Sequence, residues 1–244
     1  MNKIETLKSW INESKNIVVF SGAGMSVPSG IPDFRSSNGI YSEKFKSVFR
    51  PEEVISHTFF MNYPELFYEF YFNKMVYKDA LPNLSHRYFK KLSETKNISV
   101  VTQNIDGLDK KAGLKNVYEI HGTIWENYCT KCHKFYSLDD IDTSKGIPHC
   151  SCGGIIKPNV VLYEEGLDNN VINGAIKSIM EADMLIVIGT SLIVYPAASF
   201  INYYRGKRLV IINKSKTAGD SLANLVINDD IINVVKELEK WEMP

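Results

Sequence analysis

Hydrophobic and polar positions follow two patterns along this chain. Short, nearly continuous apolar runs are separated by longer segments in which apolar residues return every three or four positions. The short runs occupy residues 16–20, 97–102, 116–120, 159–163, 184–189 and 208–213. Runs of this kind are typical of parallel strands that are covered on both faces. Strands that alternate with helices predict an α/β protein with a doubly wound, Rossmann-like parallel sheet.

The segments between the apolar runs predict helices. Apolar and aromatic residues recur at helical spacing in residues 63–71. Residues 83–94 begin with Asn83, a favourable helix cap. Residues 228–241 begin with acidic side chains, which suit the positive end of a helix dipole. Residues 1–16 place apolar side chains on one helical face, but they lack the continuous apolar segment of a signal peptide.

Composition narrows the possible functions. Lys and Arg number 28, and so do Asp and Glu, so that the net charge is zero and favours neither nucleic acid nor a membrane surface. No run of about 18 apolar residues predicts a membrane span. We therefore expect a cytoplasmic protein. In that reducing compartment, cysteines serve metal or redox roles more often than disulfides.

The first apolar run is followed by a glycine-rich loop. Residues 22–24 read Gly-Ala-Gly, and small residues of this kind let a backbone approach a pyrophosphate. The usual dinucleotide fingerprint would place a third glycine where Val27 stands, and prolines and a glycine in residues 28–32 oppose a normal helix. A glycine-rich surface turn is the alternative. Arg35 offers a planar fork for a phosphate, or else a surface ion pair.

Polar side chains follow two further predicted strands. Gln103, Asn104 and Asp106 come after residues 97–102, and His121 comes after the next run. Ligands bind at the carboxyl ends of parallel strands, so these side chains are candidates for one site. A histidine there can move a proton near neutral pH, although a structural role for it is equally open.

Residues 127–158 carry the four cysteines and little apolar material. Such a segment needs another source of stability, and we expect a small inserted lobe that is held by a metal. Cys129 and Cys132 have the spacing of a zinc knuckle, whereas Cys150 and Cys152 are separated by a single residue. A structural Cys₄ zinc site is favoured, with redox cysteines or a Cys₃His site as alternatives. A closed four-ligand site stabilises the protein and leaves no position for a substrate.

Several motifs together resemble one family. "GAGMSVPSGIPDFR", "TQNIDGL", "HGT", the paired cysteines, "PNVVLY", "GTSLIVYPAA" and "INK" are similar, in order and spacing, to the sirtuins of bacterial type, which are NAD-dependent protein-lysine deacylases. The resemblance covers about residues 16–215 and implies one sirtuin-type domain over residues 1–244. Its Rossmann-like lobe would comprise about residues 1–35, 80–126 and 159–244. Its small lobe would combine the zinc knuckle, about 127–158, with a helical part, about 36–79.

The resemblance also implies the site residues. NAD would be the co-substrate, and one structural Zn²⁺ would be held by the four cysteines. The implied catalytic residues are His121, as general base, with Asn104 and Asp106 in the nicotinamide pocket. The implied NAD contacts are Ala23, Phe34, Arg35, Gln103, Ile105, Asp106, His121, Thr190, Ser191, Asn213 and Asp230.

The implied reaction transfers an acyl group from a protein lysine to ADP-ribose. The acyl oxygen attaches to the ribose C1′ as nicotinamide leaves, and His121 then removes a proton from the ribose hydroxyls. The products are free lysine, nicotinamide and O-acyl-ADP-ribose. Mono-ADP-ribosyl transfer and a non-catalytic NAD-sensing, zinc-knuckle binding module are the alternatives. A hydride-transferring dehydrogenase is the weakest alternative, because the expected first helix is interrupted and no catalytic dyad stands out.

The implied partner is an acylated-lysine peptide bound as an extended strand. It would lie near Val160, Leu162 and Tyr163 on one side and along the stretch from Ser191 to Tyr195 on the other. Glu164 stands where the family often has Gly, and either adds negative charge beside the peptide or points to solvent. Relatives that prefer succinyl groups carry a Tyr and an Arg three residues apart. Here the corresponding residues are Tyr71 and Lys74, so we expect acetyl and other apolar acyl groups.

Overall fold

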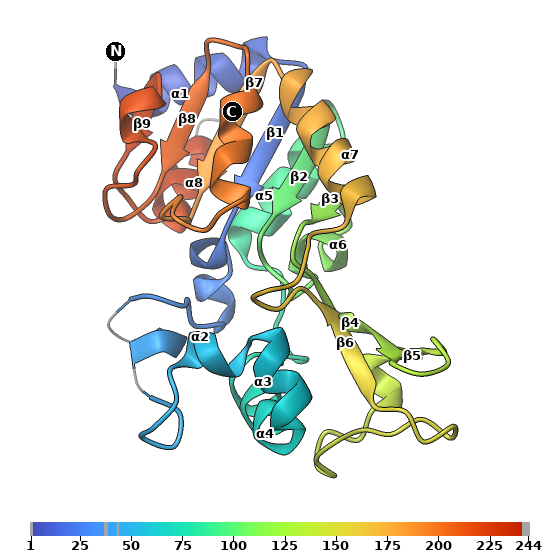
Figure 1. Ribbon diagram of the computed structural model, residues 1–244. Coiled ribbons are helices and arrows are strands. Elements are labelled where there is room, and N and C mark those ends of the chain that lie inside the picture. Colours follow the sequence, from blue (N-terminus) through green and yellow to red (C-terminus); the bar gives the residue numbers. More distant parts are fainter. Residues whose placement is uncertain (1, 37–38, 43, 241–244) are drawn as a thin grey trace.

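The computed structural model describes residues 2–36, 39–42 and 44–240. Figure 1 shows two bodies, one built on a large sheet and the other on short helices and a small sheet. The strands are β1 (Asn16–Ser21), β2 (Asn97–Thr102), β3 (Asn116–Glu119), β4 (Gly122–Cys129), β5 (Phe135–Ser137), β6 (Ile156–Val160), β7 (Met184–Ile188), β8 (Leu209–Ile212) and β9 (Leu225–Ile227).

Within the described residues, the large sheet has six strands in the order β3-β2-β1-β7-β8-β9, and all of its pairings are parallel. This is the Rossmann strand order, so the predicted fold class is confirmed. The order reverses between β1 and β7, which pair from Ile17 with Met184 to Ser21 with Ile188. The carboxyl ends of these two strands are therefore where a ligand crevice is expected.

Helices cover both faces of the large sheet. The helices are α1 (Lys3–Glu13), α2 (Pro51–Val54), α3 (His57–Asn62), α4 (Pro64–Lys74), α5 (Leu84–Leu92), α6 (Leu108–Lys111), α7 (Asn169–Met180) and α8 (Ile231–Lys240). Side chains of α1, α5 and α8 pack with one face of the sheet, and α7 packs with the other. The large sheet is thus buried on both sides, as its continuous apolar runs predicted.

The predicted helix starts are confirmed where a cap could be recognised. The Asn83 side chain accepts from the Ser85 N–H at 3.0 Å at the start of α5. Before α8, the Asp230 carboxylate accepts from the Ile232 N–H at 2.8 Å. Residue 241, which the sequence placed in that last helix, lies outside the described residues. No helix in the described part of the chain is long and apolar enough to cross a membrane.

The run at residues 159–163 is not a strand of the parallel sheet, so that prediction is wrong. The strand is β6, which ends at Val160 and pairs antiparallel with β4 in a second sheet of order β5-β4-β6. Buried Ile156, Pro158 and Val160 alternate with less buried residues, the pattern of a sheet with one covered face. In the rest of this run, residues 161–163, the chain makes one parallel bridge, between Tyr163 and Ser56.

The connections to the site are short 3₁₀ helices and loops. The 3₁₀ helices are η1 (Ala23–Met25), η2 (Val27–Ser29), η3 (Ile40–Ser42), η4 (Leu138–Asp140), η5 (Ala197–Tyr203) and η6 (Asp220–Leu222). Two of them, η1 and η2, replace the long helix that usually follows the first Rossmann strand, as the prolines predicted. The small body has its own aromatic core, in which Phe67, Tyr68 and Tyr71 of α4 are buried.

Candidate active site

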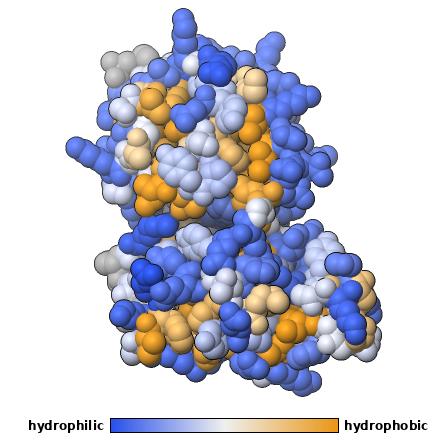
Figure 2. All heavy atoms as spheres, in the orientation of Figure 1, coloured by the Kyte–Doolittle hydropathy of each residue, from blue (hydrophilic) through white to orange (hydrophobic). Residues whose placement is uncertain are grey.

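A cavity of about 640 Å³ lies at the carboxyl ends of β1, β2 and β7, between the two bodies. Figure 2 shows the molecular surface narrowing there. Every residue predicted to contact NAD lines the cavity, as do Val160, Leu162 and Tyr163. Of residues 191–195, all of which are described, Ser191, Val194 and Tyr195 line it, whereas Leu192 and Ile193 do not. The fold thus brings together residues that are far apart in sequence.

The glycines after β1 are required by backbone packing. The Gly24 N–H donates to the Gly189 carbonyl at 2.9 Å, which joins the loop after β1 to the loop after β7. A Cβ on Gly24 would lie 2.7 Å from the Gly189 Cα, and one on Gly22 would lie 2.8 Å from the Thr190 Cβ. Larger residues would therefore force apart the two loops that form the floor of the crevice.

Asn104 and Asp106 lie in a buried hydrogen-bond network beneath this floor. The Asn104 Nδ2 donates to the Gly22 carbonyl and to the Ser26 Oγ, each at 3.1 Å. Ser26 in turn donates to the Asp106 Oδ2 at 2.6 Å, and the Leu108 N–H donates to its Oδ1 at 2.8 Å. Burial raises the pKa of Asp106, and these two hydrogen bonds oppose that rise. The network fixes the side chains of Asn104 and Asp106, both of which line the cavity.

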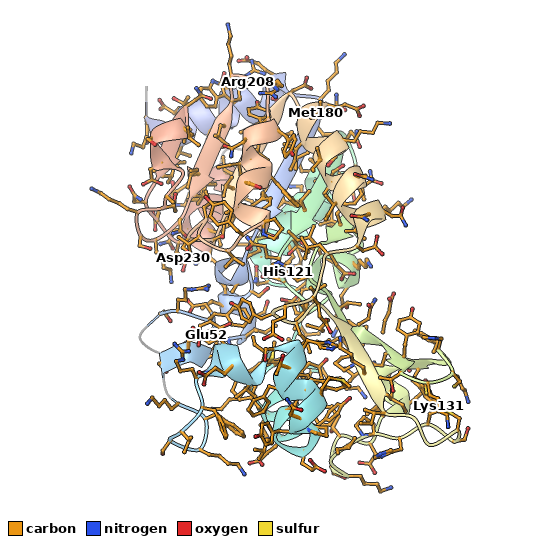
Figure 3. The ribbon with its side chains drawn as sticks, in the orientation of Figure 1. Glu52, His121, Lys131, Met180, Arg208 and Asp230 are labelled. Atoms are coloured by element: carbon orange, nitrogen blue, oxygen red, sulfur yellow. The ribbon has the colours of Figure 1, made fainter. Side chains whose placement is uncertain are left out.

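His121 lies where the two bodies meet (Figure 3). Its Nδ1 is 3.1 Å from the Gln103 carbonyl oxygen. Because a carbonyl only accepts, Nδ1 must carry the proton, and the Nε2 lone pair of the neutral ring remains available as a base. Burial lowers the pKa of His121, and the hydrogen bond to Gln103 opposes this only in part. The ring is therefore neutral at pH 7, as a general base must be.

The far end of the cavity is lined by polar groups that follow β7, β8 and β9. The Gln103 Nε2 donates to the Thr190 Oγ1 at 3.1 Å. The Asn213 Nδ2 donates to the Ser215 carbonyl at 2.9 Å. Asp230, labelled in Figure 3, forms an ion pair with Lys214 at 2.9 Å. These groups offer hydrogen bonds and one cation to a ligand that extends along the strand ends.

Phe34 and Arg35 extend from the first loop into the cavity lining. The Phe34 ring packs edge-on against Tyr41, with centroids 5.3 Å apart. The Arg35 guanidinium lies 5.4 Å from the centroid of the same ring. Arg35 is thus held by a cation–π contact, an arrangement that leaves its planar fork able to bind a phosphate.

The edge predicted to bind the peptide is already partly paired. The Val161 N–H donates to the His121 carbonyl at 2.9 Å. The Tyr163 N–H donates to the Ile55 carbonyl, and its carbonyl accepts from the His57 N–H, both at 3.0 Å. Several main-chain groups between residues 160 and 164 are therefore used inside the protein and are not free to pair with a peptide strand.

The Glu164 side chain is exposed, and one hydrogen bond holds its carboxylate. Its Oε2 accepts from the Thr58 N–H at 2.8 Å, at the first turn of α3. Its φ of 76° is in the left-handed region, which explains physically why a glycine suits this position. The backbone strain, on the order of 1 kcal/mol, is offset by the contact with the helix N-terminus.

The four cysteines form one cluster whose sulfur atoms all lie within 4.8 Å of one another. The Cys129 and Cys152 sulfurs are 3.4 Å apart, and those of Cys132 and Cys150 are 3.6 Å apart. A tetrahedral zinc with Zn–S bonds of about 2.3 Å requires sulfurs about 3.8 Å apart, so the cluster fits this ion. The shorter Cys-x-Cys spacing is accommodated, and within the described residues no histidine belongs to the cluster.

Several residues of the site were not recognised in the sequence. Ser26 and Tyr41 contact predicted residues, Trp125 donates to the Asp106 carbonyl at 2.8 Å, and Lys214 pairs with Asp230. Glu165, next to the edge predicted to bind the peptide, was not predicted either. Ser26, in "GAGMSVPSGIPDFR", and Lys214, in "INK", lie within motifs that carry the resemblance, and the other three residues do not.

Comparison with known proteins decides the family. The Sir2 family model matches residues 22–196, which is well over half of the chain. The chain belongs to the Sir2 family. A relative from Clostridium perfringens, named NAD-dependent protein deacetylase, is 56% identical over 237 residues, covering 96% of this chain and 97% of the relative. The sirtuin resemblance is therefore confirmed.

Solved sirtuin structures superpose closely on this one. A Sir2 variant with a deacetylated p53 peptide and 3′-O-acetyl-ADP-ribose has a TM-score of 0.89 at 35% identity, and 98% of each chain is covered. A complex of Sir2 with a p53 peptide and NAD⁺ has a TM-score of 0.85 at 37% identity, with 99% of each chain covered. The similarity extends over both bodies and the cavity between them.

Proposed function

We propose that this sirtuin removes acetyl groups from protein lysines with NAD as co-substrate and releases nicotinamide and O-acetyl-ADP-ribose. The observation that carries the proposal is His121. It is a neutral, buried imidazole with its Nδ1 proton fixed by Gln103, and it lines the same cavity as Asn104 and Asp106. The relatives named NAD-dependent protein deacetylase, and the Sir2 complexes with peptide and acetyl-ADP-ribose, support it.

Different residues of the cavity lining would bind different parts of NAD. Bound NAD would supply an activated bond between nicotinamide and the ribose C1′. Asn104 and Asp106 would hold the nicotinamide, with Ile105 between them. Ala23, Phe34 and Arg35 would bind the diphosphate side, and Thr190, Ser191, Asn213 and Asp230 the adenosine side. His121 would accept a proton from the ribose hydroxyls through Nε2, because Gln103 holds Nδ1 in its protonated form.

A structural zinc ion would be held by Cys129, Cys132, Cys150 and Cys152. The Cys152 N–H and the Tyr136 hydroxyl lower the pKa of Cys150 to about 6, which favours the thiolate that binds metals. Four protein ligands leave no position for substrate, so the ion would stabilise the small sheet. Thiols kept free for a metal suit a reducing compartment, and we propose the cytoplasm.

The acylated lysine would enter beside Val160, Leu162 and Tyr163, with the loop from Ser191 to Tyr195 on its other side. Lys74, Met75 and Tyr77 line the cavity from the end of α4. Tyr71, by contrast, is buried in the aromatic core and is not among the described residues of the lining. A Tyr and Arg pair for a succinyl carboxylate is therefore not assembled here, and small apolar acyl groups fit best.

The deciding experiment is incubation of the protein with NAD and an acetyl-lysine peptide, followed by mass spectrometry of both. Deacetylated peptide and O-acetyl-ADP-ribose in equal amounts are the expected products. ADP-ribose attached to protein would instead indicate ADP-ribosyl transfer, and NAD binding without turnover would indicate a sensor. Parallel reactions with succinyl-lysine and long-chain acyl-lysine peptides would test the acyl preference, and a higher kcat/KM for succinyl-lysine would contradict it.

A further inference from the structure

One exposed acidic side chain lines the cavity beside the proposed peptide edge. We propose that Glu164 is a specificity-determining residue, which favours acyl-lysine peptides that carry a lysine or an arginine beside the acylated residue. The inference rests on the proposed function. It adds a preferred class of substrate sequence to a peptide site whose main-chain pairing selects little by itself.

Glu164 occupies a backbone position that favours other residues. The Glu165 N–H donates to the Leu162 carbonyl at 3.0 Å, which closes a turn with Glu164 as its third residue. A positive φ, here 76°, is usually taken by glycine or asparagine at this position of a turn. Backbone strain of this kind gathers at functional sites, and Glu164 lines the cavity.

The turn is anchored on both sides, so the place of the Glu164 carboxylate is fixed. Both backbone polar groups of Tyr163 are used in the pairing with Ile55 and His57. The Glu164 Oε2 accepts from the Thr58 N–H at 2.8 Å. Hydrogen bonding by Thr58 lowers the pKa of Glu164, so the carboxylate is ionised at pH 7. A negative charge is therefore held at one point on the exposed edge of the cavity.

The charge of Glu164 is not neutralised by a lysine or arginine of the described residues. The neighbouring Glu165 differs, because its carboxylate pairs with Lys157 at 3.1 Å and lies 2.9 Å from the His57 ring. On the other side of the proposed peptide path, the loop from Ser191 to Tyr195 has no charged residue. A peptide between this loop and the edge would therefore meet the unpaired charge of Glu164.

An ionised carboxylate beside a peptide strand discriminates between peptides by charge. It attracts a cationic side chain of the peptide and repels an acidic one, so it both favours one class of sequence and disfavours another. Pairs of exposed charges contribute about twofold to fivefold in affinity, because water and salt screen them. We therefore expect a modest preference that becomes weaker as the salt concentration rises.

The test uses pairs of acetyl-lysine peptides that differ at one flanking position, which is arginine in one peptide and glutamate in the other. The position is moved along the peptide on both sides of the acetyl-lysine. Calorimetry without NAD gives the Kd of each peptide, and steady-state kinetics with NAD give kcat/KM. For at least one position, the wild type should prefer the arginine peptide by about fivefold in both measurements.

Three variants separate charge from shape. Glu164→Gln keeps an oxygen that can accept from Thr58 but loses the charge, so its preference should fall close to one. Glu164→Gly also removes the backbone strain and should lose the preference as well. Glu181→Gln is the matched control, because that carboxylate is 66% exposed but precedes β7, at the end of the strand away from the cavity. It should keep the wild-type preference.

Equal use of both peptides by the wild type at every position would overturn the inference. So would a preference that persists in Glu164→Gln, since that variant keeps the side-chain shape without the charge. Product analysis separates this result from the proposed function. If the wild type forms O-acetyl-ADP-ribose equally from both peptides, only the role of Glu164 is wrong. If it forms none from any peptide, the deacetylase assignment fails, whatever the Kd values.

Discussion

The Gln103 carbonyl decides which nitrogen of His121 carries the proton. Neutral imidazole has two tautomers, and a backbone acceptor 3.1 Å from Nδ1 selects one of them. The lone pair of Nε2 is then left for the substrate. Burial keeps this ring neutral by lowering its pKa, as the proposed role of His121 as general base requires.

Replacement of His121 by alanine should remove nearly all deacetylation while the protein stays folded and keeps its zinc. General-base catalysis contributes about 10²–10⁴-fold, so the expected loss in kcat is of that order. In the wild type, kcat should fall as pH drops through the pKa of His121, and that pKa should lie below the ordinary value of about 6.5. Steady-state kinetics from pH 5 to pH 8 measure both effects. Normal turnover by the alanine variant would contradict the assignment.

Asp106 offers a second test at this scale. Its two oxygens accept from Ser26 and from the Leu108 N–H. Asp106→Asn replaces one acceptor by a donor, so it should weaken nicotinamide inhibition and base exchange, both measured with labelled nicotinamide. Ser26→Ala removes one of the two hydrogen bonds but keeps the carboxylate, and should have a smaller effect. An unchanged nicotinamide response in Asp106→Asn would exclude this residue from the nicotinamide pocket.

The residues that the sequence could identify are those that follow strands. Gln103, Asn104 and His121 each come directly after a recognisable apolar run, so their positions at the sheet edge were predictable. Ser26 and Tyr41 were not, because their partners are 80 and 122 positions away and only the folded chain brings them together. Long-range contacts between loops leave no periodic signal in the sequence.

At the scale of elements, the turn that follows Cys152 depends on two glycines. Gly153 has a φ of 80°, the left-handed conformation that the sharp turn after Cys152 requires. Gly154 follows, and a Cβ there would lie 2.6 Å from the Cys129 sulfur. The turn can therefore close around the four sulfurs only if this position has no side chain.

Gly154→Ala should thus lose zinc and lower the Tm by several degrees, since metal binding contributes directly to the folding free energy of small zinc sites. Gly166→Ala is the matched control, because a Cβ there meets no atom within 4 Å. Elemental analysis measures zinc per chain, and differential scanning calorimetry measures the Tm. An alanine at residue 154 that retains one zinc per chain and the wild-type Tm would show that the turn tolerates the methyl group.

The strand predictions were correct where a whole apolar run belongs to one sheet. They were wrong where the run continues past the end of a strand. The four central strands of the large sheet are buried on both faces, so their apolar runs matched β1, β2, β7 and β8 closely. Residues 159–163 look the same in the sequence, but Val160 ends β6 and Leu162 is buried in a loop. An apolar run indicates that a segment is buried, but it does not indicate with which sheet the segment pairs.

At the scale of the whole molecule, Glu165 joins three segments around the cavity. Its Oε2 accepts from the Leu162 N–H at 2.9 Å and pairs with the Lys157 Nζ of β6 at 3.1 Å. Its Oε1 lies 2.9 Å from the Nδ1 of His57 at the start of α3. One carboxylate thus holds the helical part, the small sheet and the peptide edge of the cavity in fixed relation. Burial alone would raise the pKa of Glu165, but these contacts outweigh it and the pKa is lowered.

Glu165→Gln should lower the free energy of unfolding at pH 7 by about 1–3 kcal/mol, the range for hydrogen bonds to a charged group. A carboxyl whose folded pKa is depressed stabilises the protein above its unfolded pKa of about 4.3, and the contribution disappears as pH falls through the folded value. Urea unfolding of both proteins should therefore give curves that differ at pH 7 and converge below pH 4. Glu164→Gln, which changes an exposed carboxylate with one helix contact, should cost less. A difference between wild type and Glu165→Gln that persists unchanged below pH 4 would mean that shape, and not charge, makes Glu165 important.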